Sequence, residues 1–142
     1  MCWLLNIRGS DIARNPVVQA YAILDWSEQV HLFTNATNAP EMQLHWNDGD
    51  DDPVIDMVEI HPLDGLEAFF ATAERCNYQI DPASTPQAVL AMLEARHKQE
   101  PSCKIVEGQD PCILPKARKN RVEIAGSREA HLRDGAAMVR FL

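Results

Sequence analysis

The sequence predicts an α/β domain in which helices pack on the faces of a mixed β-sheet. Short apolar runs typical of buried strands alternate with segments of helical periodicity, and an initial pair of runs has the spacing of a β-hairpin. The chain has 142 residues, which is enough for one domain with a hydrophobic core and too few for two. We therefore expect one layered domain with a sheet at its centre.

The first half of the chain supplies most of the expected strands. Residues 2–7 are apolar and end in an Arg-Gly-Ser-Asp turn, which predicts a buried strand followed by a loop. Residues 25–28 form the turn of the predicted hairpin. The other elements expected in this half are strands at 17–24, 30–34 and 56–60, a short helix at 40–46 and an acidic loop at 48–52.

The second half is expected to supply the helices. Apolar side chains at helical spacing predict a helix at 63–76 and another at 86–97. Ser84 or Thr85 is expected to cap the second helix, with Pro86 in its first turn, where proline is tolerated. The remaining predicted segments are strands at 78–80 and 103–106 and a linker at 111–115.

Residues 116–142 predict one long basic helix. Asn120 is the expected N-cap, and Glu123 stands at the position that completes a capping box. Apolar residues recur on one face of this helix: Val122, Ala125, Leu132, Ala136 and Val139. No glycine or proline stop signal follows Leu142, so we expect this helix to open a further domain that would cover its apolar face.

The charge distribution argues against nucleic-acid binding. The net charge is −8, and residues 1–115 alone carry −12, whereas residues 116–142 carry +4. Phosphate contacts need clustered Lys and Arg, and acidic residues interrupt the basic tail. We therefore expect no nucleic-acid partner.

The sequence also bounds the compartment. No apolar run approaches the roughly 20 residues that a membrane span needs, and the first residues carry no signal-peptide pattern, so a cytoplasmic location without membrane contact is expected. The four cysteines form no Cys-x-x-Cys pair. Reduced thiols are the expected state for all of them: Cys2, Cys76, Cys103 and Cys112.

The segment Asp48–Glu59 places oxygen-bearing side chains at the spacing of a calcium loop. Pro53 stands where that loop needs a glycine, and Pro62 opposes a helix that starts near Glu59. A solvated acidic loop is therefore the favoured interpretation, and a calcium site is the alternative.

The turn from Arg8 to Asp11 is the best functional candidate within the chain. A short turn at a strand end holds an Arg fork and a carboxylate in fixed geometry, either as an internal ion pair or directed toward a substrate peptide in a neighbouring domain. His61 at a strand end is a further interdomain candidate and is expected to be structural. No catalytic residue and no metal ligand are assigned in this chain, and His131 and Asp134 are expected on a helix surface.

Two motifs near the ends of the chain resemble one enzyme family. Lys116-Ala-x-Lys-Asn-x-x-Glu-x-x-Gly-x-Arg-x-Ala-His-x-x-Asp-Gly-Ala-Ala is similar to the start of the catalytic domain of the long, three-domain Xaa-Pro aminopeptidases (aminopeptidase P, peptidase family M24). Trp3-Leu-Leu-Asn-Ile-Arg-Gly-Ser-Asp-Ile, with Asn15-Pro-Val and Tyr21-Ala-Ile, resembles the entry to their middle domain. Ile60-His-Pro and Pro111-x-x-x-x-Lys-Ala are weaker matches in the same order.

The resemblance implies a creatinase/prolidase N-terminal-like fold with a mixed, roughly six-stranded sheet. It implies that residues 1–112 are the non-catalytic middle domain and that 113–142 are the linker and first helix of a truncated catalytic domain. The parent would be a hydrolase that releases the N-terminal residue from peptides with proline second, using two manganese ions. Their ligands, two Asp, one His and two Glu, would lie beyond residue 142, so this chain alone is expected to be inactive.

The resemblance also sets the expected role and partners. The domain would shape the substrate cleft and contact the other domains of the parent or a second subunit in a homodimer, with Arg8, Asp11 and His61 as cleft or interdomain residues. A stand-alone module of the same fold, binding a small ligand or a protein, is the alternative.

Overall fold

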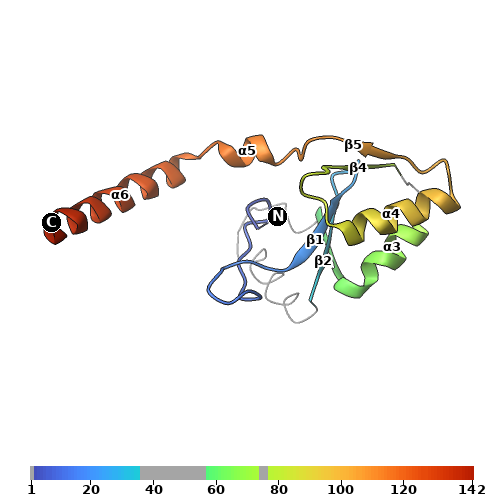
Figure 1. The fold of residues 1–142 in the computed structure, drawn as a ribbon, viewed down its shortest axis with the longest axis horizontal. Coiled ribbons are helices and arrows are strands. Elements are labelled where there is room, and N and C mark those ends of the chain that lie inside the picture. The colour runs from blue at the N-terminus through green and yellow to red at the C-terminus, as the bar shows by residue number, and fades with distance from the viewer. Residues whose placement is uncertain (1, 36–56, 74–76) are drawn as a thin grey trace. The chain divides into compact units, whose positions relative to one another are not determined.

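The computed structural model describes residues 2–35, 57–73 and 77–142, and it divides the chain into two compact units, Met1–Asp110 and Pro111–Leu142 (Figure 1). The helix expected at 40–46, the acidic loop at 48–52 and most of the candidate calcium loop lie outside the described residues.

A three-stranded mixed sheet forms the centre of the first unit. The strands are β1 (Ala20–Leu24), β2 (Val30–Thr34) and β3 (Val58–Pro62), in the order β1-β2-β3 (Figure 1). β1 and β2 pair antiparallel with Ile23 opposite His31, which confirms the predicted hairpin. β2 and β3 pair parallel with His31 opposite Glu59 and Phe33 opposite His61.

The hairpin turn is held by one carboxylate. Oδ1 of Asp25 accepts hydrogen bonds from the backbone N–H of Ser27 at 2.8 Å, from the Ser27 hydroxyl at 2.7 Å and from the backbone N–H of Gln29 at 3.0 Å. Glu28 takes a positive φ of 68°, which closes the turn. These three hydrogen bonds hold the pKa of Asp25 below its usual value, and the bond from the Ser27 hydroxyl is the largest cause.

One face of the sheet is covered by helices. The chain runs from β3 through a 3-10 turn (η1, Leu63–Gly65) into α3 (Leu66–Thr72), and α4 (Gln87–Gln99) packs against α3 (Figure 1). The helix expected at 63–76 is thus shorter than predicted within the described residues. The buried side chains of this layer are Phe33, Leu66, Phe70 and Leu93.

The N-terminal segment covers the opposite face. Leu5 and Ile7 pack with Val18, Val30 and Leu32 in a second core cluster. The prediction of a strand at residues 2–7 is wrong, because this segment forms hydrogen-bonded turns. Asn6 takes a positive φ of 49°, which a β-ladder does not accommodate. The apolar pattern predicted burial correctly and the backbone conformation incorrectly.

A second, two-stranded parallel sheet pairs β4 (Tyr78–Ile80) with β5 (Ile105–Glu107). The sheet of roughly six strands is therefore corrected: the described residues form three strands in one sheet and two in another. One reason is that the N-terminal segment, counted as a strand, packs on the sheet as turns. The fold class, α/β with a mixed sheet and helical layers, is confirmed.

Two local predictions around α4 and Cys103 are wrong. The N-cap of α4 is Pro86, with no side-chain cap, because Ser84 and Thr85 form a turn in which their N–H groups bind the carbonyl of Asp81. Cys103 is buried and disulfide-bonded, whereas Cys2 and Cys112 are reduced thiols as expected. Spacing along the sequence does not report the distance between sulfur atoms, which is what decides whether a disulfide forms.

The second unit consists of two helices. The segment expected as a linker contains the short helix α5 (Ile113–Ala117), and α6 spans Arg121–Phe141. The predicted capping box is confirmed: Oδ1 of Asn120 accepts from the N–H of Glu123 at 2.8 Å, and Oε2 of Glu123 accepts from the N–H of Asn120 at 2.8 Å. Val122, Leu132 and Val139 on α6 are each at least 75% exposed within this unit.

Candidate functional site

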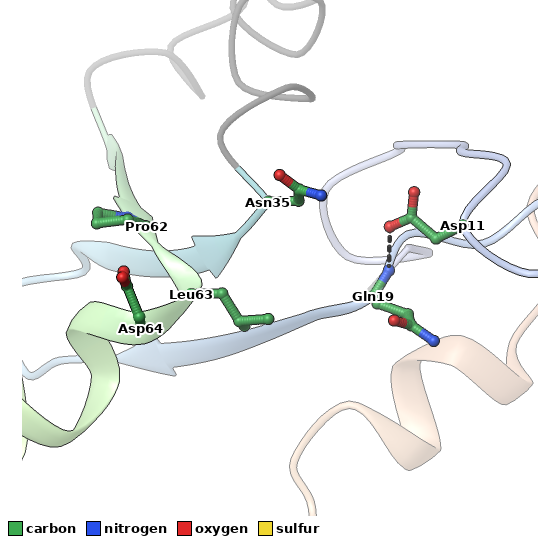
Figure 2. A pocket seen from close by; sticks show the side chains of 6 residues that line it. All are labelled: Asp11, Gln19, Asn35, Pro62, Leu63 and Asp64. Carbon is green, nitrogen blue, oxygen red and sulfur yellow. Dashed lines mark hydrogen bonds between the residues drawn. The ribbon is translucent and has the colours of Figure 1, made fainter.

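A pocket of about 720 Å³ lies at the edge of the sheet where β2 and β3 end and β1 begins. Figure 2 shows Asp11 and Gln19 on one side of it, Pro62, Leu63 and Asp64 on the other, and Asn35 at the end of β2 between them. The carboxyl ends of parallel strands commonly form binding crevices in α/β domains. The fold therefore places a polar hollow where such domains bind ligands.

The pocket has an acidic and hydrogen-bonding lining. Asp11 and Asp64 contribute carboxylates, Gln19 and Asn35 contribute amides, and Leu63 supplies an apolar wall. Oδ2 of Asp11 accepts a hydrogen bond from the backbone N–H of Gln19 at 2.8 Å, so this carboxylate is fixed to the start of β1 (Figure 2). Such a lining favours a positively charged or hydrogen-bond-donating ligand.

The three site residues predicted from the sequence, Arg8, Asp11 and His61, lie in different places in the structure. Asp11 lines the pocket, and Pro62, the residue after His61, lines it too. Arg8 is not among the lining residues, and its Nη1 donates to the carbonyl of Ile7 at 3.2 Å. His61 instead belongs to a second constellation on the helix-covered face of the sheet.

This second constellation, the histidine cluster, consists of His31, Glu59 and His61. Nδ1 of His31 lies 3.2 Å from Nε2 of His61 and 3.2 Å from Oε2 of Glu59, and Nε2 of His61 lies 3.5 Å from the same Glu59 oxygen. Three potential metal-ligand atoms thus converge, and no other such group of His, Cys, Asp and Glu occurs in residues 2–35, 57–73 and 77–142.

The parallel register builds the cluster. His31 stands opposite Glu59 across β2 and β3, and Glu59 and His61 are two positions apart on one strand, so all three side chains point to the same face. The rings are braced by aromatic neighbours: Phe33 stacks on His61, and Phe69 lies 4.8 Å from the His31 ring. The side-chain geometry is therefore fixed by backbone pairing and packing.

The two histidines of the cluster are mostly buried, and its glutamate is exposed to solvent. The His31 and His61 side chains are 16% and 22% exposed, whereas that of Glu59 is 60% exposed. Oδ2 of Asp25 lies 3.8 Å from the second ring nitrogen of His31 and so stands behind the cluster.

Sequence reasoning missed His31 and Glu59 as partners of His61. His31 and His61 are 30 residues apart, and a search for closely spaced ligands along the chain does not join them. The usable signal was the spacing of Glu59 and His61, which places both side chains on one face once the strand predicted at 56–60 extends to Pro62 as β3 does. Only the pairing of β2 with β3 shows that His31 completes the group.

Comparisons with known proteins give a consistent family likeness. A family model described as the creatinase/prolidase N-terminal domain matches residues 1–123. Xaa-Pro aminopeptidase 1 of Dictyostelium discoideum is 31% identical over 144 residues, covering 100% of this chain and 20% of that protein. Aminopeptidase P1 of Arabidopsis thaliana is 31% identical over 163 residues, covering 100% of this chain and 24% of that protein.

A solved structure shows the same likeness in three dimensions. The X-prolyl aminopeptidase of Caenorhabditis elegans, described as a cytosolic enzyme with a di-nuclear active site, superimposes with a TM-score of 0.68 at 28% identity. The match covers 99% of this chain and 22% of the worm protein. The chain thus spans about a fifth to a quarter of the relatives it matches.

None of the helices within the described ranges combines the length and hydropathy that a bilayer span requires.

Proposed function

The chain belongs to the creatinase/prolidase N-terminal domain family, and we propose that it is the non-catalytic domain of a metal-dependent Xaa-Pro aminopeptidase that shapes the substrate cleft. The parent hydrolyses the bond between an N-terminal residue and a following proline. Residues 1–112 form the cleft-shaping domain, and 113–142 form the linker and first helix of the catalytic domain.

One observation carries this proposal: essentially the whole chain matches one part of several aminopeptidases. The Dictyostelium and Arabidopsis relatives cover all of it at 31% identity, and the worm structure covers 99%. The apolar residues Val122, Leu132 and Val139, which are exposed within the second unit, are side chains of the kind that an interdomain contact buries.

The histidine cluster does not fit the two-manganese centre implied for the parent. That centre needs two Asp, one His and two Glu, whereas the cluster offers two His and one Glu whose three ligand atoms suit a single ion. The two manganese ions therefore belong, in this proposal, to the remaining domains, and this chain by itself releases no amino acid.

The pocket at the sheet edge supplies a concrete role for the domain. Asp11 and Asp64 give this face a negative charge that attracts the N-terminal amine of a short peptide, and the fixed position of Asp11 orients it. Arg8 and His61 remain interdomain candidates. We further propose a cytoplasmic location, contact with the other parent domains and assembly of the parent as a homodimer.

The first experiment is to read the source transcript past the codon for Leu142. A frame that continues into a domain with the Asp-Asp-His-Glu-Glu ligand set supports the proposal. A stop codon directly after Leu142 contradicts it, and the stand-alone binding module then becomes the better explanation.

The second experiment tests the cleft role in the full-length parent. Asp11→Asn should raise the KM for a tripeptide with proline second several-fold with kcat retained, because it weakens binding away from the reacting bond. Glu94→Gln on the exposed side of α4 is the matched control. Equal kinetic constants for the Asp11 variant, the control and the natural protein would show that this pocket has no part in substrate binding.

A further inference from the structure

We propose that His31, Glu59 and His61 form a mononuclear zinc site that links β2 to β3. This site is separate from the two metal ions expected in the catalytic part of the parent. The protein supplies two imidazole nitrogens and one carboxylate oxygen, and water completes the coordination.

The distances within the cluster fit a tetrahedral ion. Zinc bonds of about 2.0–2.1 Å separate neighbouring ligand atoms by about 3.3–3.4 Å in tetrahedral geometry. The three separations in the cluster are 3.2, 3.2 and 3.5 Å. Six-coordinate Mg²⁺, with bonds of about 2.1 Å, sets neighbouring ligands about 3.0 Å apart and prefers oxygen ligands, so it fits less well.

The hydrogen-bonding chemistry of the cluster also favours a cation. Every pair among the three atoms lies within 3.5 Å. When one of the two facing imidazole nitrogens carries a proton, that single N–H must serve both neighbouring atoms, because the carboxylate has no proton to donate. When both nitrogens carry protons, the two N–H groups face each other 3.2 Å apart. A metal ion between the three atoms interacts favourably with all of them at once.

Asp25 occupies the place of an outer carboxylate. Its Oδ2 lies 3.8 Å from Nε2 of His31, which is longer than a hydrogen bond, and the nearby negative charge favours a proton on Nε2 with the lone pair of Nδ1 directed into the cluster. Its Oδ1 is bound to the turn at Ser27 and Gln29, which holds the carboxylate in place. Zinc-bound histidines usually have such a partner on their second nitrogen.

The open side of the cluster leaves a position for water. Glu59 is 60% exposed, whereas Phe33 and Phe69 cover the imidazole rings. Two His, one Glu and water is a ligand set that zinc accepts, and for such nitrogen-containing sites the affinity of zinc exceeds that of manganese. The site would therefore select zinc in a protein whose other metal centre uses manganese.

The test is zinc binding by the full 142-residue chain after treatment with a chelator and its removal. We expect one equivalent of Zn²⁺ per chain by competition with a chromophoric chelator, and a higher Tm when zinc is present. Co²⁺ as a probe should give the intense visible bands of tetrahedral coordination. Manganese at the same concentration should give a smaller Tm shift.

Variants assign the ligands. Glu59→Gln and His61→Ala should each remove the zinc-dependent Tm shift. Asp25→Asn should weaken zinc binding by about 10- to 100-fold, because the carboxylate charge beside His31 is lost. This variant keeps the oxygen that accepts the hydrogen bonds of the turn. His131→Ala, on exposed α6, is the matched histidine control and should bind as the natural chain does. Because Glu59 is exposed, its variant should fold even if a histidine variant does not, and circular dichroism checks this.

Two results would overturn the proposal. One is the absence of zinc binding at micromolar concentrations by a folded natural chain. The other is binding that survives Glu59→Gln and His61→Ala but disappears in a Cys2→Ser, Cys112→Ser double variant, which would assign the metal to the two reduced thiols.

Discussion

The imidazole of His61 stacks on the phenyl ring of Phe33, with ring centroids 4.8 Å apart and planes inclined by 19°. The two residues stand opposite each other in the parallel pairing of β3 with β2. Phe33 is 1% exposed and belongs to the core cluster beneath α3 and α4. The orientation of a polar cluster at the surface is thus set directly by the hydrophobic core.

Phe33→Ala should destabilise the first unit by about 3–5 kcal/mol, since it removes a buried aromatic ring and leaves a cavity. Urea unfolding followed by circular dichroism measures the change. Leu24→Ala is the control, because Leu24 is 61% exposed and its loss should cost within about 0.5 kcal/mol. Similar losses for both variants would mean that Phe33 does not anchor the core.

Gly9→Ala should destabilise the chain by about 1–3 kcal/mol through overpacking. A Cβ at residue 9 would lie 2.6 Å from Cγ2 of Val18, whose side chain is buried, and 3.1 Å from the carbonyl oxygen of Val17. Gly126→Ala provides the contrast: its Cβ meets nothing within 4 Å, and alanine favours the helix by up to about 1 kcal/mol. Thermal melts of the two variants should shift in opposite directions.

Tyr78→Phe should leave the stability at pH 7 unchanged or raise it by up to about 1 kcal/mol. The Tyr78 hydroxyl is buried and has no hydrogen-bond partner within the described residues, so its loss removes a desolvation cost. Burial raises the pKa of Tyr78 above its usual 10.0.

The same pKa shift predicts an alkaline effect. Above pH 10 the unfolded chain loses the Tyr78 proton while the folded chain retains it, so the unfolded state binds fewer protons and stability falls with rising pH. Urea midpoints between pH 9 and 11 should fall less steeply for Tyr78→Phe than for the natural chain. Tyr21→Phe is the matched control, and an equal flattening in that variant would contradict the assignment to Tyr78.

Asp81→Asn should weaken the chain at pH 7 and reduce its sensitivity to acid. The Asp81 carboxylate accepts hydrogen bonds from the N–H of Asp110 and from that of Ala83, both at 2.9 Å, and these bonds, that of Asp110 first, lower its pKa below 3.8. Because the folded-state pKa is depressed, this stabilisation is present above pH 3.8 and is lost as the pH falls through the folded-state value.

Denaturant midpoints from pH 7 down to pH 2 measure this effect. The stability difference between the natural chain and Asp81→Asn should shrink below pH 4, whereas Asp134→Asn on α6 should leave the curve unchanged. A constant difference across the range would show that the carboxylate acts through its shape and not through its charge.

Local sequence patterns predicted much of the fold. The hairpin between β1 and β2, the strands near His61 and Tyr78 and the capping box at Asn120 depend on residues close together in the sequence, and they were predicted correctly. The turns at residues 2–7 were missed, because apolar composition reports burial and not backbone conformation. The predicted cap at Ser84 or Thr85 was wrong, because the N–H groups of both residues bind the carbonyl of Asp81 and the helix begins after Pro86.

The residues of the two candidate sites also differ in whether neighbouring residues in the sequence indicate them. Asp11 was singled out in the sequence as a carboxylate in a turn after an apolar segment, and in the structure it lines the pocket, while its role toward a substrate stays a prediction. His61 was singled out in the sequence without His31 and Glu59, which lie beside it in the histidine cluster.

The sequence by itself determined the α/β class, the capped terminal helix, the acidic character of the first 115 residues and the family likeness, because each is written in composition or in neighbouring residues. Tertiary structure alone decided which strands pair, that Cys103 is disulfide-bonded, and that His31 meets Glu59 and His61. The physical reason is that parallel strand pairing and packing join residues far apart along the chain, and their distance in space is fixed only when the core forms.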